Sequence, residues 1–259
     1  MSSEQPERPG TADGTRKSLE VGLSACECRR SVPLVVGLAL VGAILTWAVL
    51  KVFYPPIVFP ENHGFKVSML PPPEMVEWAR AIRQRMALVN PVFALGFFGA
   101  ILSGAMSLAW LGRWRTRAAG LLGAVLTAAV GGGFGCLAGL VGYAIGGVPA
   151  SADSTTELAK TLTLQVAVLM VFGAGVGIGI GSVMIHTWRA TGRGLGAGVA
   201  GGFLAGLLHT PLAALLFPAI RSDTVVPSSP ERTLWIAIVS LLLGITVSAL
   251  VQAKQTVAE

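Results

Sequence analysis

The sequence is poor in charged residues, which make up only 12% of its 259 positions. Soluble domains carry about 25%, and a soluble protein with so little charge could not cover its surface with polar groups. The charges that are present cluster in short segments between long uncharged runs. This pattern is typical of membrane spans separated by loops, so we expect an integral membrane protein embedded in a lipid bilayer.

The residue patterns of metal binding and of common catalytic sites are also missing. Three cysteines are too few for a disulfide framework, and Cys26 and Cys28 lack further ligands at the spacing of a zinc site. Neither His-Glu-X-X-His nor Gly-X-Ser-X-Gly occurs. No Asp, Glu, Lys or Arg is securely placed inside an apolar run, which argues against a proton-coupled pump or a carboxylate-based metal transporter. We therefore expect no enzyme, no metal site and no cofactor.

Six apolar runs are long enough to cross a bilayer core as helices. The predicted fold is an all-α, polytopic membrane bundle of about six transmembrane helices over residues 32–251. The spans are predicted at residues 32–50, 91–111, 118–148, 162–185, 195–217 and 234–251. The third run is longer than one span needs and has three consecutive glycines in its middle. It is either one long helix or a helix broken at the glycines, and we favour one span.

The segments outside the spans are polar. Residues 1–31 cannot bury enough apolar area to fold alone, which predicts a disordered tail, and residues 252–259 form a C-terminal tail. The loop 51–89 begins with a Pro-rich stretch, after which apolar residues recur every three or four positions over 74–89. This spacing predicts an amphipathic helix. The helix either lies in the headgroup layer or extends the next span.

The net charge of +6 does not indicate a nucleic-acid partner, because the basic residues flank apolar runs and form no folded basic surface. Basic residues at span ends orient a membrane protein, with the richer side in the cytoplasm. We therefore predict both termini in the cytoplasm, in a plasma or inner membrane. The short loops carry Arg113, Arg115, Arg117, Arg189 and Arg193 on the side of the termini, against Lys160, Arg221 and Arg232 on the other side.

Two Trp-Arg pairs and two glycine segments indicate an internal repeat. Trp114-Arg115 closes the second apolar run and Trp188-Arg189 closes the fourth, as interfacial anchors do. At the same separation of 74 residues, Phe98-Gly99-Ala100 recurs as Phe172-Gly173-Ala174. These matches suggest that spans two and three are duplicated as spans four and five, with span six a further half unit. Copies of two helices each would be parallel to one another.

Alternating glycines distinguish the fourth run. They leave a helix with little bulk on much of its circumference, so that neighbouring helices can approach closely. We predict a helix-packing role for them, and such faces also suit a homo- or hetero-oligomer. The residues are Gly173, Gly175, Gly177, Gly179 and Gly181.

Polar residues inside the spans are the candidates for a binding site. His209 and Thr210 precede Pro211, which frees a backbone carbonyl one turn earlier, and Gln165 lies in the fourth span. A polar residue at membrane depth is either functional or a neutral group that is bonded to a neighbouring helix.

Two functions are open on the sequence alone. The glycine-rich, uncharged helix surfaces favour a structural or interaction subunit of a membrane assembly. The alternative is a small transporter or channel for an uncharged or weakly polar solute, which the repeat and the irregularity at His209 and Pro211 support.

Overall fold

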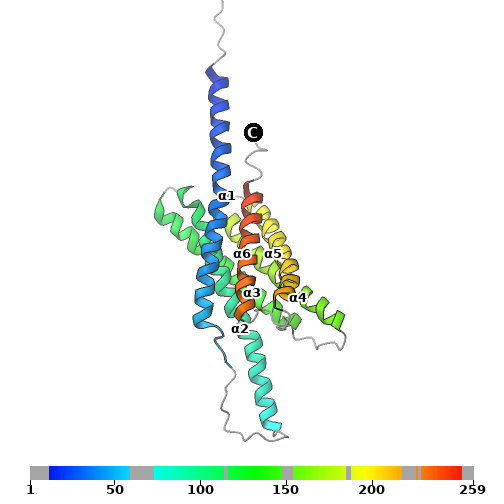
Figure 1. The fold of residues 1–259 in the computed structure, drawn as a ribbon. Helices are drawn as coiled ribbons and strands as arrows, with labels where there is room; N and C mark the ends of the chain where they lie inside the picture. The colour runs from blue at the N-terminus through cyan, green and yellow to red at the C-terminus, as the bar shows by residue number, and fades with distance from the viewer. Residues whose placement is uncertain are drawn as a thin grey trace, which may run out of the picture.

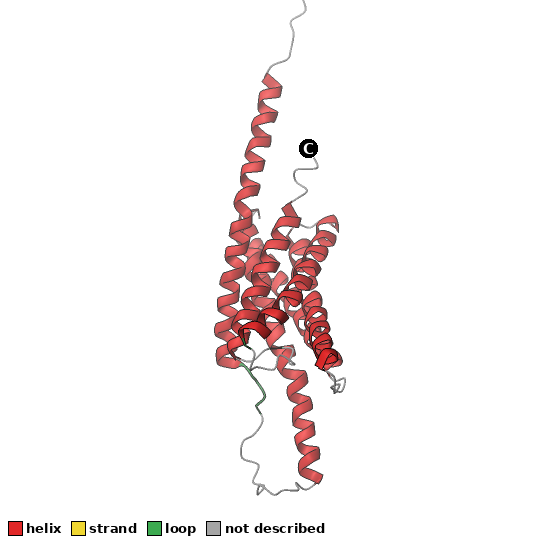
Figure 2. Cartoon of the chain, turned by 45° about the vertical axis from the view of Figure 1, so that its right-hand side comes forward, coloured by secondary structure: helices red, strands yellow, loops and turns green. Residues whose placement is uncertain are grey.

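The computed structural model describes residues 12–58, 73–113, 116–146, 154–184, 188–217, 226 and 229–252. Six long helices make up most of this part: α1 (Ala12–Phe53), α2 (Pro73–Ser107), α3 (Arg117–Gly146), α4 (Ser154–Gly179), α5 (Trp188–Leu216) and α6 (Ser229–Gln252). A 3₁₀ helix, η1 (Leu108–Arg113), follows α2, and a π-helical turn, η2 (Ile180–Met184), follows α4. Each long helix contains a stretch long and apolar enough to cross a membrane, which confirms the predicted all-α membrane bundle (Figure 2).

The helices run alternately in opposite directions through the bundle (Figure 1). α1 enters and α6 ends at one end. α1, α3 and α5 end at the opposite end of the bundle, which we call the loop end. α2, α4 and α6 therefore begin at the loop end, and the start of α2 projects well beyond it.

Helices that are adjacent in the sequence pack against each other, and α1 also packs against α6, so the bundle closes on itself. α4 is the most enclosed span, with 72% of its apolar window buried against 28% for α1. It touches α2 and α6 in addition to α3 and α5. The three helices that begin at the loop end thus form the inside of the bundle, and α1, α3 and α5 form its outside.

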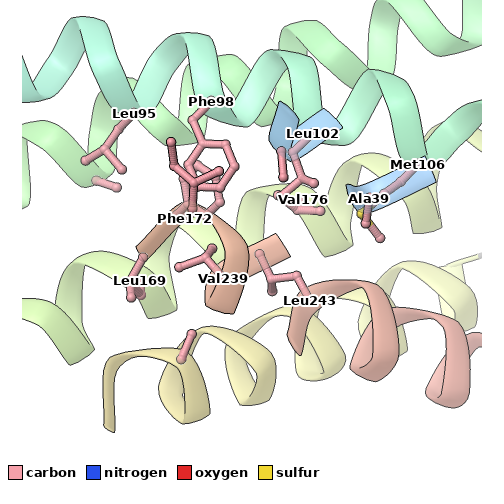
Figure 3. Packing of buried hydrophobic residues seen from close by; sticks show 14 of the residues in the cluster. Ala39, Leu95, Phe98, Leu102, Met106, Leu169, Phe172, Val176, Val239 and Leu243 are labelled. Atoms are coloured by element: carbon pink, nitrogen blue, oxygen red, sulfur yellow. The ribbon is translucent and has the colours of Figure 1, made fainter. Parts of the chain in front are cut away.

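Large apolar side chains from α2, α4 and α6 meet in the middle of the bundle. The ring centroid of Phe98 lies 4.8 Å from that of Phe172 and 5.4 Å from that of Trp235, and all three side chains are buried. Figure 3 shows Phe98 and Phe172 together, with Val239 and Leu243 of α6 nearby. Because lipid tails are as apolar as these side chains, close van der Waals packing is what stabilises this core in a membrane.

A seam of small residues joins α2 to α3. At three positions along it, a Cβ atom added to a glycine would collide with the backbone of the other helix. Such contacts, about one helical turn apart, let the two backbones approach closely. The contacts are Gly99 with Gly131, Gly135 with Leu95, and Gly139 with Val92.

A second seam of the same kind joins α4 to α5. Three of its contacts again combine a glycine pair with two glycines that lie against larger residues of the other helix. A Cβ on Gly206 would lie 2.7 Å from the Cα of Val166, and a Cβ on Gly139 in the first seam would lie 2.6 Å from the Cα of Val92. The contacts are Gly173 with Gly198, Gly202 with Leu169, and Gly206 with Val166.

Several helices extend further than hydropathy alone predicts. α1 begins at Ala12, inside the segment expected to be a disordered tail. Ala, Lys, Arg, Leu and Glu there favour helix, and lengthening an existing span needs no new helix nucleus. Residues 1–11 and 253–259 lie outside the described part. α2 starts with Pro73 and Glu74, a favourable first turn, and includes 74–89 as an extension of the second span.

The glycines and the proline inside the third and fifth spans do not break them. α3 continues through Gly131–Gly133 as one helix, as favoured above. α5 continues through Pro211, because only one intrahelical hydrogen bond is removed by a proline and neighbouring helices hold the segment in place.

Candidate functional site

A buried histidine–glutamate pair lies near the loop end, between α5 and α6. His209 lies in the last third of α5, and Glu231 lies in the first turn of α6. The distance between His209 Nε2 and Glu231 Oε1 is 3.7 Å, and both side chains are 0% exposed. The two groups are therefore within ion-pair distance but beyond the length of a hydrogen bond.

Glu231 is the site residue that the sequence interpretation misses, because hydropathy places it in the loop before a span at residue 234. In the structure α6 begins at Ser229, and its apolar span begins at Glu231. Ser229-Pro230-Glu231 has the character of a helix start, with proline in the first turn and an acidic residue beside it. That signal could have placed Glu231 on a helix. Glu231 is the first residue of this span and not a mid-span residue, so it lies at the edge of the apolar stretch.

Two other candidate residues lie at a similar level of the bundle. Gln165 of α4 is 1% exposed and precedes Val166, which packs against Gly206, three residues before His209. Thr210 is also buried, but its hydroxyl donates to the carbonyl of Gly206 at 3.2 Å. Thr210 thus satisfies its polar group within α5, whereas Gln165 brings an amide to the interior from a third helix.

Buried polar atoms without partners mark this level of the bundle. Within the described part of the chain, neither ring nitrogen of His209 has a hydrogen-bond partner, and Nε1 of Trp235 has none. Buried polar groups are nearly always bonded, and an unsatisfied one costs about 1–3 kcal/mol. We call these two residues, His209 and Trp235, together with the buried Glu231 and Gln165, the polar layer. These residues bring polar groups of three helices into the interior of the bundle.

The aromatic core lies directly next to the polar layer. Trp235 follows Glu231 by one turn of α6, and its ring packs against Phe98, which in turn packs against Phe172. The other residues of the polar layer therefore lie between the loop end and this aromatic core, and Trp235 belongs to both.

Contacts beside Glu231 hold the start of α6 against α1. The Arg232 guanidinium lies 4.2 Å from the centre of the Tyr54 ring, and Trp47 Nε1 donates to the Thr233 hydroxyl at 3.1 Å. Burial raises the pKa of Tyr54, an effect that Arg232 partly offsets, so the phenol is neutral at physiological pH. Three consecutive residues of α6 thus contact α5, the residue that directly follows α1, and α1 itself, and these contacts hold Glu231 opposite His209.

The glycines of the fourth span divide between two neighbours. One set faces α5 and the other faces α3, so these faces of α4 and η2 are covered within the chain. Gly173, Gly177 and Gly181 lie against Gly198, Gly194 and Ala190, whereas Gly175 and Gly179 lie against Phe134 and Thr127.

The expected Trp-Arg anchors are only partly within the described residues. Trp188 and Arg189 begin α5 and are exposed, Trp188 by 90%. They therefore start the fifth helix, where the sequence pattern has them close the fourth. Trp114 and Arg115 lie outside the residues whose side chains are described.

Metal ligands are not gathered in the part of the chain that the structure describes, where no three His, Cys, Asp or Glu residues could hold an ion together. Comparison with protein-family models, with curated proteins and with solved structures gives no match, so the function has to be inferred from the arrangement of residues in this multi-pass membrane bundle.

Proposed function

We propose that the protein is a small transporter or channel for an uncharged or weakly polar solute, and not an enzyme. The observation that carries this proposal is the fully buried His209–Glu231 pair. Ionisable residues inside spans are energetically costly and typically serve a pathway for ions or solutes. A bundle that only had to fold would be at least as stable with apolar residues in their place.

We also propose that the hairpins α2–α3 and α4–α5 are copies of one unit. Each of the three seam contacts between α2 and α3 has a counterpart between α4 and α5. The residue numbers differ by 74 between α2 and α4, and by 67 between α3 and α5. For example, Gly99 with Gly131 corresponds to Gly173 with Gly198. Shared register over three successive contacts is a stronger argument for duplication than matching glycines in the sequence alone.

A third unit would consist of α6 paired with α1. A Cβ on Gly244 of α6 would lie 3.1 Å from the Cβ of Ala39 in α1, so a small-residue contact joins these helices too. His209 then belongs to the second unit and Glu231 to the third. Transporters built from repeats often bind their substrates at the interface between repeats, which supports a site at this pair.

A subunit of a larger assembly is the second candidate. The glycines that favour it in the sequence mostly face other helices of the same chain. Gly133 of α3 and Gly196 of α5 are different, because a Cβ on either would meet nothing within 4 Å. These outward positions are where a partner helix, from a second copy or another protein, would dock.

We propose that both termini are cytoplasmic, in a plasma or inner membrane. Arg189 and Arg193 lie at the start of α5, at the end of the bundle where α1 enters, and basic residues are enriched on the cytoplasmic side. The polar layer would then lie near the outer surface. A reporter fused at the C-terminus should be active only in the cytosol, and activity on the other side would contradict this orientation.

Transport can be tested with purified protein in liposomes that are exposed to an inward gradient of glycerol, urea or erythritol. Stopped-flow light scattering should show faster entry of at least one solute than in protein-free liposomes. His209→Ala should reduce that rate to background at equal reconstitution. Ser248→Ala, which changes a buried hydroxyl elsewhere in α6, should not. Background entry of all three solutes, with recovery of a stoichiometric partner by pull-down, would replace the transport proposal by the subunit function.

A further inference from the structure

We propose that the His209–Glu231 pair holds one exchangeable proton and couples its movement to that of the solute. The inference rests on the proposed transport function and adds the coupling ion to it. It also revises the argument from sequence against proton coupling, since that argument placed Glu231 in a loop.

The charge of the pair depends on how many protons it carries. A neutral imidazole facing a carboxylate has a net charge of −1, one added proton makes the pair neutral, and a second makes it +1. Both side chains are fully buried, and burying net charge is costly. Of the three states, only the one with a single proton leaves the pair itself neutral, whether that proton resides on the imidazole or on the carboxyl group.

The geometry allows the proton to move between the two groups. The separation of 3.7 Å is slightly beyond the 2.6–3.2 Å reach of proton transfer, and a small rotation of either side chain closes the gap. Both ring nitrogens of His209 lack other hydrogen-bond partners among the described residues. The imidazole can therefore accept a proton at one nitrogen and release one from the other.

Among the described residues, His209 and Glu231 are the fully buried ionisable side chains, and the cationic groups near the loop end are more exposed. On α1, Lys51 Nζ lies 4.9 Å from the centre of the Trp47 ring. On α6, the Arg232 guanidinium lies over the ring of Tyr54. On α4, Lys160 is only half-buried. None of these groups belongs to the fully buried set that contains His209 and Glu231.

The coupling step conserves protons and forms no covalent bond to the solute. A proton from water at the loop end adds to the neutral imidazole, and the imidazolium then faces the carboxylate as a neutral pair. In this state the pair can stay enclosed while the bundle changes conformation. When water reaches the site from the other side, it accepts the proton, and the pair returns to a net charge of −1. Because this charged state requires contact with water, the proton is released only when the site is open to water.

Proton movement can be measured with pyranine inside proteoliposomes, with the membrane potential clamped by potassium and valinomycin. Addition of the solute that enters fastest in the scattering assay should accelerate the change of internal pH. Glu231→Gln and His209→Gln should each reduce this acceleration at least tenfold, whereas Ser248→Ala should leave it unchanged. Solute entry without proton movement would overturn the proton inference and leave transport intact. Background rates of both would overturn the transport proposal itself.

A second readout does not depend on transport. Infrared spectra of the protein in bilayers, recorded as the pH is stepped, should contain a carboxylic C=O band that changes with pH and disappears in Glu231→Gln. Glu231→Asp should restore a band, and His209→Gln should alter its pH dependence, which a purely structural role of the histidine would not do. Thermal unfolding of each variant shows whether it is folded. If folded Glu231→Gln has the same pH-dependent carboxyl band as the wild type, the proton site is not at this pair.

Discussion

At the scale of single residues, buried polar groups at the loop end fall into two kinds. Thr210 bonds to its own helix, and Asn90 accepts from the N–H of Ile57 at 3.2 Å and donates to its carbonyl at 3.1 Å. These groups are satisfied and hold the structure together. The imidazole of His209 and the indole N–H of Trp235 are not satisfied by the described residues, which is why we assign function to the polar layer and structure to Asn90.

This distinction predicts that Asn90→Ala lowers the free energy of unfolding by about 1–3 kcal/mol, because both backbone groups of Ile57 lose their partner. Asn90→Asp should cost less, since the side chain still accepts from the Ile57 N–H. Reversible unfolding in detergent measures both values, and the solute flux of folded Asn90→Ala should equal that of the wild type. Flux lost at unchanged stability would instead place Asn90 in the site.

At the scale of helices, the seams explain where glycine is required. Gly99→Ala and Gly173→Ala should each lower the free energy of unfolding by about 1–3 kcal/mol, because the added methyl group collides with backbone and the helices must separate. Gly133→Ala is the matched control, since nothing lies within 4 Å of its Cβ. It should be neutral or stabilising by up to about 1 kcal/mol, as alanine favours helix. Equal stability of all three variants would contradict the close backbone contacts at Gly99 and Gly173.

The sequence predicts the six helices well. It predicts poorly which residues of neighbouring helices lie opposite each other. Apolar length alone identifies the six spans, because a bilayer requires about 20 such residues. In the proposed duplication, α2 corresponds to α4 with a shift of 74 residues, but α3 corresponds to α5 with a shift of 67. Only spatial contacts distinguish these shifts in helices rich in Gly and Ala. Glu231 is missed because a hydropathy window assigns a charged residue to a loop, although a carboxylate in the first turn of a helix is favourable.

At the scale of the whole molecule, the architecture is three inner helices, each beginning at the loop end, surrounded by three outer ones. The filled aromatic centre means that a solute could cross only if inner helices moved relative to each other. The His209–Glu231 pair joins an outer helix to an inner one, at the boundary between two proposed units. A change in its protonation would therefore act where relative movement of the units is required.

The pairing of α1 with α6 has a consequence for how the protein is made. Helices enter a membrane in the order of synthesis, so the four spans α2–α5 are made before α6 can pack against α1. Until α6 inserts, His209 lacks Glu231, and Trp47 and Tyr54 lack Thr233 and Arg232. The insertion of α6 thus closes the bundle and completes the candidate site in the same event, so that a chain stalled before this helix has neither the closed fold nor the His209–Glu231 pair.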